Sequence, residues 1–386
     1  MVKVRARLLA LASLWIAAAC AAAQAPTEGQ IQSIRREILG EMERKGIPGL
    51  SAAIALEGNL AWSEGFGFSD LENRVAATAK TVYRLASISK SVSAVAALRL
   101  WEEGKLDLDA PVQTYCKAFP EKSWPVTTRQ LLGHLSGIRH YKPGEIESTK
   151  HYASLTQALE IFKDDPLAHR PGEKYTYTTY GYTLLGCVLE GASGQAFADH
   201  LDKSVMKPAR LDAMRVDDVY AIIPNRAQGY SKRPDGALRN SGLADTSYKI
   251  PGGGLCATTE DLARFAIALM GGTLLKPETL ELAWTPQKLS DGSATGYGLG
   301  FGIGERNGFK VVSHTGSQQR VNTVLLMVPA KKLAVAVMCN LEGSAPMALA
   351  RRIATILAPD LGGGRAASTA RLSIRLGACE ALRSCQ

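Results

Sequence analysis

The sequence has few of the residues that mark metal centres. It contains only seven cysteines and six histidines among 386 residues, with no C-x-x-C pair and no H-x-H or H-E-x-x-H spacing. Zinc modules and metal-dependent hydrolases hold their ions with such spacings. We therefore expect a protein that uses neither a metal nor an organic cofactor.

Two further patterns are missing. The chain has no G-x-S-x-G segment, the sharp turn that carries the nucleophile of α/β-hydrolases. The formal net charge is +9, but the lysines and arginines are scattered, without a basic run interleaved with aromatic residues. Nucleic-acid-binding surfaces concentrate their charge, so we expect no nucleic-acid partner.

Long apolar runs are almost absent. One begins at Leu8, behind three basic residues, and ends in alanines before Gln24. It falls short of the roughly 20 apolar residues that cross a bilayer, and its layout is typical of a secretory signal. We predict a signal peptide over 1–23, a periplasmic or secreted mature protein, and no stable membrane span after removal. A retained anchor and lipidation at Cys20 are less favoured alternatives.

Six cysteines remain beyond the predicted signal. Cys187 and Cys339 lie in apolar stretches, where a buried free thiol is the favoured interpretation. An exported compartment permits disulfides, but spacing does not determine which cysteines pair. A bond between Cys379 and Cys385 is one alternative.

The spacing of apolar residues changes twice along the chain. It is helical over 28–46 and then alternates around Glu57-Gly58-Asn59, as in a β-hairpin. It is mostly helical again over 87–289. Strand-like segments and a helix follow, at 298–303, 310–313, 321–328, 333–339 and 345–357.

These patterns predict an α/β (α+β) fold. We expect an antiparallel sheet built from both chain ends and flanked by helices, with an inserted, mainly helical lobe and a ligand cleft between the two. The predicted domain covers 28–358, with 28–86 and 290–358 in the α/β lobe and 87–289 in the helical lobe. Residues 359–386 form a C-terminal extension, either mobile or a peripheral helix.

Ser87-Ile88-Ser89-Lys90 places a hydroxyl and an amine three residues apart. On a helix such residues share a face, so the Lys90 amine can take the Ser87 proton. A free lysine has a pKa of about 10.4, so the site must supply desolvation or nearby positive charge to keep Lys90 neutral. Ser204 and Lys207 share this spacing, which makes the tetrapeptide alone a weak signal. Ser87 differs because it opens a strongly helical run, whose N-terminus stabilises an alkoxide.

Two later elements complete a pattern. Tyr177-Thr178-Thr179 lies in a tyrosine-rich loop before an apolar helix, and His314-Thr315-Gly316 follows a strand-like segment. In this order, with Ser87-x-x-Lys90, they resemble the S-x-x-K, Y-x-N and K/H-T-G motifs of the serine β-lactamase and penicillin-binding-protein superfamily. The resemblance runs from about residue 45 to about residue 358. Its class C-related branch, the β-lactamase-like serine hydrolases, esterases and peptidases, includes the mitochondrial serine β-lactamase-like proteins.

The resemblance implies a β-lactamase/transpeptidase-like fold and a role for each motif. Ser87 would be the nucleophile, Lys90 its proton acceptor and Tyr177 a second acid/base. The backbone N–H groups of Ser87 and Ser317 would form an oxyanion hole. The strand bearing His314 would pair with the substrate, and the implied substrate-binding residues are Thr179, His314, Thr315 and Gly316.

Two positions depart from the pattern. Thr179 stands where many relatives have asparagine, and a hydroxyl does not reproduce an amide that both donates and accepts. His314 replaces a lysine, so a permanent charge becomes one that titrates near neutrality. We therefore expect binding of a carboxylate-bearing substrate to weaken as the pH rises through the pKa of His314.

The sequence thus predicts an exported serine hydrolase that forms an acyl-enzyme on Ser87. Its partner would be a small-molecule or peptide acyl substrate, cleaved at an ester or amide bond. A general esterase or peptidase, including a D-Ala-D-Ala carboxypeptidase-like enzyme, is preferred, and a true β-lactamase is second. A non-hydrolytic penicillin-binding or scaffold protein is the alternative from another class. We interpret His134 as a structural hydrogen-bonding residue, and the sequence does not specify an oligomeric state.

Overall fold

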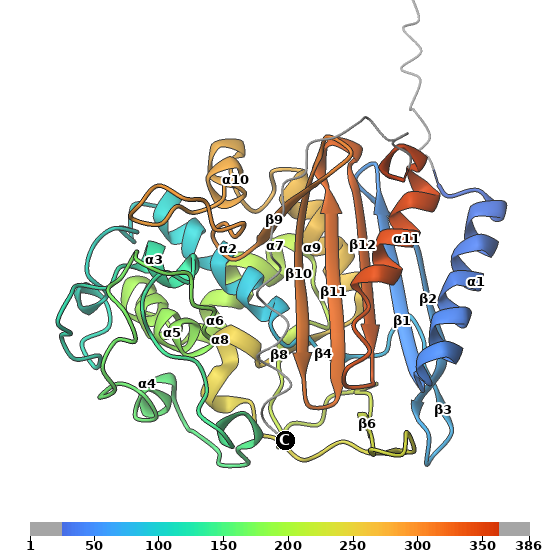
Figure 1. The fold of residues 1–386 in the computed structure, drawn as a ribbon, viewed down its shortest axis with the longest axis horizontal. Coiled ribbons are helices and arrows are strands. Elements are labelled where there is room, and N and C mark those ends of the chain that lie inside the picture. The colour runs from blue at the N-terminus through green and yellow to red at the C-terminus, as the bar shows by residue number, and fades with distance from the viewer. Residues whose placement is uncertain (1–24, 363–386) are drawn as a thin grey trace, which may run out of the picture.

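The computed structural model describes residues 25–362 (Figure 1). The predicted signal peptide over 1–23, with Cys20, lies outside the described residues, as do Cys379 and Cys385. Of the predicted extension, only the first residues are described, and they include the helical turn Pro359–Leu361. Between residues 25 and 362, no helix combines the length and apolar content that a bilayer span requires.

The long strands lie towards the two ends of the described chain, and helices and short strands lie between them. The helices are α1 (Glu28–Lys45), α2 (Ile88–Glu102), α3 (Thr128–Leu132), α4 (Leu155–Leu159), α5 (Tyr180–Ser193), α6 (Phe197–Leu201), α7 (Lys207–Ala209), α8 (Ile250–Gly253), α9 (Thr259–Met270), α10 (Pro277–Ala283) and α11 (Met347–Leu357). The strands are β1 (Gly49–Leu56), β2 (Asn59–Asp70), β3 (Val75–Ala76), β4 (Tyr83–Arg84), β5 (Arg215–Val216), β6 (Tyr230–Lys232), β7 (Leu238–Asn240), β8 (Leu255–Ala257), β9 (Gly302–Arg306), β10 (Phe309–Gln318), β11 (Val321–Val328) and β12 (Leu333–Cys339).

A seven-stranded antiparallel sheet joins the two ends of the chain. Its strand order is β3-β2-β1-β12-β11-β10-β9, and the early and late segments meet where β1 pairs with β12, with Leu50 opposite Cys339 and Leu56 opposite Leu333. The prediction of a sheet assembled from both chain ends is confirmed. The hairpin of β1 and β2 and the strands β11 and β12 also lie where the sequence predicts them.

Both faces of the sheet are covered, as the alternation along its central strands requires. On β12, Val335 and Val337 pack with Ile34 of α1 and Ile353 of α11, and Figure 1 shows these two helices on the outer face. The intervening Ala336 belongs to the core on the other side. Because a strand alternates its side chains between faces, the same strand supplies both cores.

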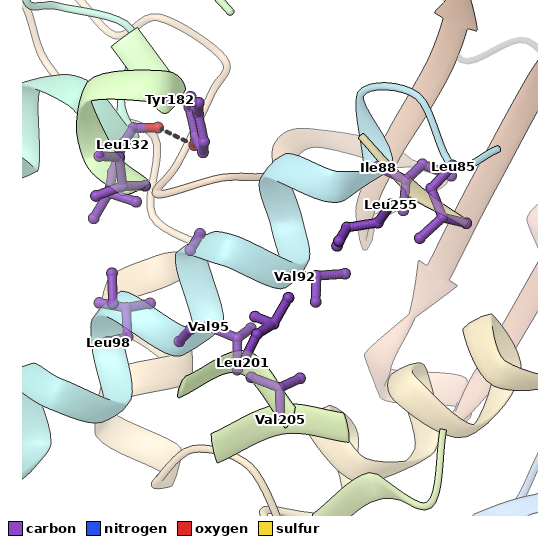
Figure 2. Close-up of a cluster of buried hydrophobic side chains, with 14 of the residues drawn as sticks. Leu85, Ile88, Val92, Val95, Leu98, Leu132, Tyr182, Leu201, Val205 and Leu255 are labelled. Carbon is purple, nitrogen blue, oxygen red and sulfur yellow. Dashed lines mark hydrogen bonds between the residues drawn. The ribbon is translucent and has the colours of Figure 1, made fainter. Parts of the chain in front are cut away.

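Helix α2 is the buried axis of the helical part. Apolar side chains surround it on all sides, which fits a helix that lies inside a core rather than at a surface. Figure 2 shows Val92, Val95 and Leu98 of α2 among side chains from other helices, and the Tyr182 hydroxyl donating to the Leu132 carbonyl at 2.9 Å. Helix α2 also contacts β10 and β11 of the sheet.

Two predicted elements differ from the structure. Helix α9 falls inside the span assigned to the helical lobe, 87–289, yet it packs against β1, β2 and β12 of the sheet. The strand expected at 298–303 begins only at Gly302, because Gly296 and Gly300 adopt positive φ angles of 71° and 87° and turn the chain.

The expectation that Cys187 is a free thiol is wrong. Cys187 of α5 forms a disulfide with Cys116, because helix α5 packs beside the loop that carries Cys116 and brings together residues 71 positions apart. Cys339 is a buried free thiol, as predicted, and so is Cys256. Apolar surroundings alone do not separate a thiol from half of a disulfide, since both are buried in cores.

We expect the Cys116→Ala/Cys187→Ala double variant to be less stable than the wild type by about 3–5 kcal/mol, because the bond closes a long loop in the unfolded chain. Urea unfolding of oxidised protein would measure the difference. Wild type treated with reductant should match the variant, and superimposable curves for the oxidised protein and the variant would contradict the prediction.

Candidate active site

Ser87 lies where the chain passes from β4 into α2. It is the N-cap residue of α2, but its side chain makes no capping hydrogen bond, so the hydroxyl is available for other contacts. The preceding Ala86 has φ 48°, in the left-handed region that residues other than glycine rarely occupy. The backbone is thus held in a costly conformation immediately before the serine, a feature that clusters at functional sites.

Lys90 is fully buried one turn along α2. Its Nζ lies 3.1 Å from Ser87 Oγ, 3.1 Å from Thr179 Oγ1 and 2.7 Å from the Gly252 carbonyl oxygen. Burial, reinforced by the charge of Lys249, lowers the pKa of Lys90 well below its ordinary value. Desolvation and nearby positive charge are the two effects that we expected to keep the Lys90 amine neutral. A neutral amine has two N–H groups, which suit Gly252 and Thr179, and one lone pair, which suits the Ser87 O–H.

Tyr177 lies beside Ser87 and lines the same cavity. Its ring centroid lies 4.7 Å from Lys90 Nζ, and desolvation raises the pKa of its hydroxyl, against a smaller opposing effect of a hydrogen bond with Ser87. The hydroxyl is therefore a protonated phenol at neutral pH. It can donate a proton but does not start as a base.

The loop that carries Tyr177 is held by two histidines. The Nδ1 atom of His134 accepts from the Thr178 N–H, and that of His140 accepts from the Thr179 N–H, both at 3.2 Å. The His134 ring also packs on Tyr177, with centroids 4.2 Å apart. This supports the structural role predicted for His134. The contribution of His140 was not predicted, since only the fold brings it to this loop.

The strand β10 forms the opposite wall of the site. It pairs with β11 along 312–318, but with β9 only along 309–313. Residues 314–318 therefore present an unpaired edge on one side. At Gly316 an added Cβ would lie 2.3 Å from the Leu85 carbonyl oxygen, so only glycine lets the strand approach the segment that precedes Ser87 this closely.

The expectation that His314 carries a charge that titrates near neutrality is wrong. Burial, with the charge of Lys90, lowers the pKa of His314 to about 3. Its Nδ1 lies 2.6 Å from the Thr315 carbonyl oxygen, to which it must donate, and its Nε2 lies 2.9 Å from the Tyr297 hydroxyl, from which it then accepts. Both ring nitrogens are engaged, and the ring is neutral.

A cavity of about 650 Å³ lies between the two walls. Of the predicted residues, it is lined by Ser87, Tyr177, Thr179, His314, Thr315 and Ser317. Lys90 is buried beneath the cavity wall and contacts Ser87. Gly316 allows β10 to pack closely against Leu85, in the segment that precedes Ser87. The structure thus brings all the predicted site residues to one place.

The cavity also has lining residues that the sequence analysis missed. The chief ones are Lys249, Tyr297, His140 and Gln318. Lys249 directly precedes Ile250-Pro251-Gly252-Gly253 of α8. Its position next to a glycine-rich segment was the one feature of the sequence that could have pointed to a place in the cavity. Within 25–362, no three histidine, cysteine or acidic side chains gather as metal ligands would.

Comparisons with known proteins agree with this geometry. The Beta-lactamase family profile matches residues 34–359. The human mitochondrial protein named serine beta-lactamase-like protein LACTB is 31% identical, over 84% of this chain and 79% of its own length.

Two solved structures share the fold. An octameric penicillin-binding protein homologue from Pyrococcus abyssi is 27% identical with a TM-score of 0.74, over 85% of this chain and 77% of that one. The D-amino acid amidase of Ochrobactrum anthropi SV3 is 22% identical with a TM-score of 0.72, over 86% and 97% of the two chains, and shows the fold alone. With a profile match over most of its length and a 31% identical relative, the chain belongs to the beta-lactamase family of serine hydrolases.

Proposed function

We propose that the protein hydrolyses ester or amide bonds through an acyl-enzyme on Ser87. The observation that carries this proposal is the buried Lys90 amine, 3.1 Å from Ser87 Oγ and with a strongly lowered pKa. Among the described residues no carboxylate pairs with this amine. A neutral amine in hydrogen-bond contact with a hydroxyl is a general base in position.

The proposed reaction has two halves. In the first, Lys90 Nζ takes the Ser87 proton as Oγ attacks the substrate carbonyl, and the backbone N–H groups of Ser87 and Ser317 hold the oxyanion. The carbonyl re-forms and the leaving group departs with a proton from the Tyr177 phenol, which the Lys90 ammonium replaces. In the second half, water attacks the carbonyl of the acyl-enzyme, and its proton passes to Lys90 Nζ. The Lys90 ammonium then returns a proton to Ser87 Oγ as the acid leaves.

The contacts of Thr179 favour an esterase over a β-lactamase. Its Oγ1 lies against Lys90 Nζ, so the side chain contacts the amine and offers no amide to a substrate. We infer that small esters are preferred over substrates that carry an acylamino group, which include both β-lactams and peptides.

We also propose an exported, periplasmic or secreted location. The charged start and short apolar run of residues 1–23 support it, and an oxidising compartment would allow the Cys116–Cys187 disulfide to form. The human relative is named as mitochondrial, so the N-terminal sequence of the mature protein, determined from the native host, would decide between a secretory and an organellar leader.

Labelling of the active site tests the proposed function. A fluorophosphonate should modify the folded protein once, and mass spectrometry should place the adduct on Ser87. A panel of aryl esters, a chromogenic cephalosporin and a D-Ala-D-Ala peptide would then rank the substrates. Folded protein that is neither labelled at Ser87 nor active on any of these would instead be a non-hydrolytic scaffold.

A further inference from the structure

A second lysine lies in the cleft and has no hydrogen-bond or ion-pair partner among the described residues. The Lys249 side chain lines the cavity beside Ser87 and is 1% exposed. Its Nζ lies over two aromatic rings, 5.6 Å from the Tyr141 centroid and 5.2 Å from that of Tyr248, and within 25–362 it has neither a hydrogen-bond acceptor nor an ion-pair carboxylate. A buried cation that lacks an acceptor is unfavourable, which makes an anionic ligand the natural occupant of the space before it.

A second donor without an acceptor lies close by. Gln318, the last residue of β10, also lines the cavity, and its buried Nε2 has no hydrogen-bond partner within residues 25–362. The position of a Cβ added at Gly253 would be 3.6 Å from Lys249 Cδ, 3.4 Å from Gln318 Oε1 and 3.9 Å from the Ala86 carbonyl carbon. Both side chains therefore come within 4 Å of one point beside the segment that leads into Ser87.

We propose that Lys249 and Gln318 form an anion subsite, and that the substrates of this protein carry a carboxylate. The inference rests on the hydrolase function proposed above and adds a substrate class to it. A carboxylate has two acceptor oxygens, one for the ammonium and one for the amide N–H. His314 is not available for this task, because both of its ring nitrogens are already engaged.

The charges around the subsite are consistent with an anion. Burial, with the charge of Arg84, lowers the pKa of Lys249 to about 7, against an opposing effect of Asp217. Asp217 forms ion pairs with Arg84 and Arg226, and a bound carboxylate would favour the charged form of Lys249. Glu342, an acidic residue among those that line the cavity, is engaged elsewhere: it accepts hydrogen bonds from the Ser241 hydroxyl and the Arg320 N–H.

Matched pairs of esters test the subsite on the purified full chain. One pair places the charge on the acyl side, adipic acid mono-4-nitrophenyl ester against 4-nitrophenyl hexanoate. The other places it on the leaving group, 3-carboxyphenyl acetate against phenyl acetate. The measured quantity is the ratio of kcat/KM for the charged ester to that for the neutral ester, in wild type, Lys249→Met and Gln318→Leu. Lys105→Met, which removes an exposed charge far from the cavity, is the control.

In one of the two pairs we expect Lys249→Met to lower the ratio by about 10- to 100-fold and Gln318→Leu by about 3- to 10-fold, as for lost charged and neutral hydrogen bonds. The pair whose ratio falls shows whether the subsite binds a carboxylate on the acyl side or on the leaving group of the substrate. Unchanged ratios in both pairs would overturn the proposal, and so would equal losses on charged and neutral esters, which would mean that Lys249 acts only through Lys90.

Failure of the proposed function would give a different result. Wild type would then hydrolyse none of the four esters. The subsite would still be measured by calorimetric titration with adipate, which should bind wild type at least 10-fold more tightly than Lys249→Met. Equal or absent binding to the two would overturn the subsite. Thermal unfolding of each variant, with Lys249→Gln as a polar substitute, separates lost binding from lost folding.

Discussion

Ser87→Ala is expected to reduce kcat/KM on an aryl ester by about 10⁴- to 10⁶-fold, the range found when the nucleophile of a serine hydrolase is removed. The substitution deletes the oxygen that must attack the carbonyl. It should leave folding intact, because the Ser87 side chain makes no capping hydrogen bond in α2. Esterase kinetics and a thermal unfolding curve would measure both effects.

The chain contains a matched control for this experiment. Ser204 has a lysine at the same spacing, yet its Oγ donates to the His200 carbonyl oxygen at 2.7 Å within a π-helical turn. Ser204→Ala should therefore keep full activity and lose only about 1 kcal/mol of stability. Loss of activity in Ser204→Ala, or more than one-hundredth of it remaining in Ser87→Ala, would contradict the assignment of the nucleophile.

These two serines show what local sequence can predict. The spacing of Ser87 and Lys90 predicts that their side chains meet on one helical face, and they do, at 3.1 Å. The same spacing at Ser204 and Lys207 gives no such contact, because Ser204 Oγ donates to the His200 carbonyl oxygen in a π-helical turn and Lys207 pairs with Asp202. The order of the motifs along the chain distinguished the two serines, and the fold then explains the difference.

The features that sequence did not predict depend on contacts between distant segments. The neutral state of His314 follows from its burial and from Tyr297, neither of which is visible in the His-Thr-Gly motif. The pairing of Cys116 with Cys187 depends on how α5 packs. The sequence around Lys249 does not predict that its side chain lies in the cavity beside Ser87, because this position depends on the packing of α8. Periodicity reports the local structure of a segment, whereas pKa values and partners are set by the surrounding fold.

Lys90→Met is expected to lower kcat/KM by about 10²- to 10⁴-fold, the usual contribution of a positioned general base. Methionine fills a similar volume but cannot accept the Ser87 proton. It also leaves the Gly252 carbonyl without the Lys90 N–H, so the variant should lose about 1–3 kcal/mol of stability. Lys207→Met is the matched control: Lys207 is exposed and lies at the same spacing from Ser204, and its removal should leave kcat/KM unchanged.

The pH profile identifies the protonation state in which Lys90 works. Because the neutral amine is the base, kcat/KM should fall as the pH drops below the pKa of Lys90 and should level off above it. Burial and Lys249 lower this pKa, so the plateau should begin well below the value of a free lysine, about 10.4. A neutral ester such as phenyl acetate should be used, since the charge of Lys249 then plays no part in binding. The acidic limb should be absent in Lys90→Met, and an unchanged limb in that variant would assign the titration to another group.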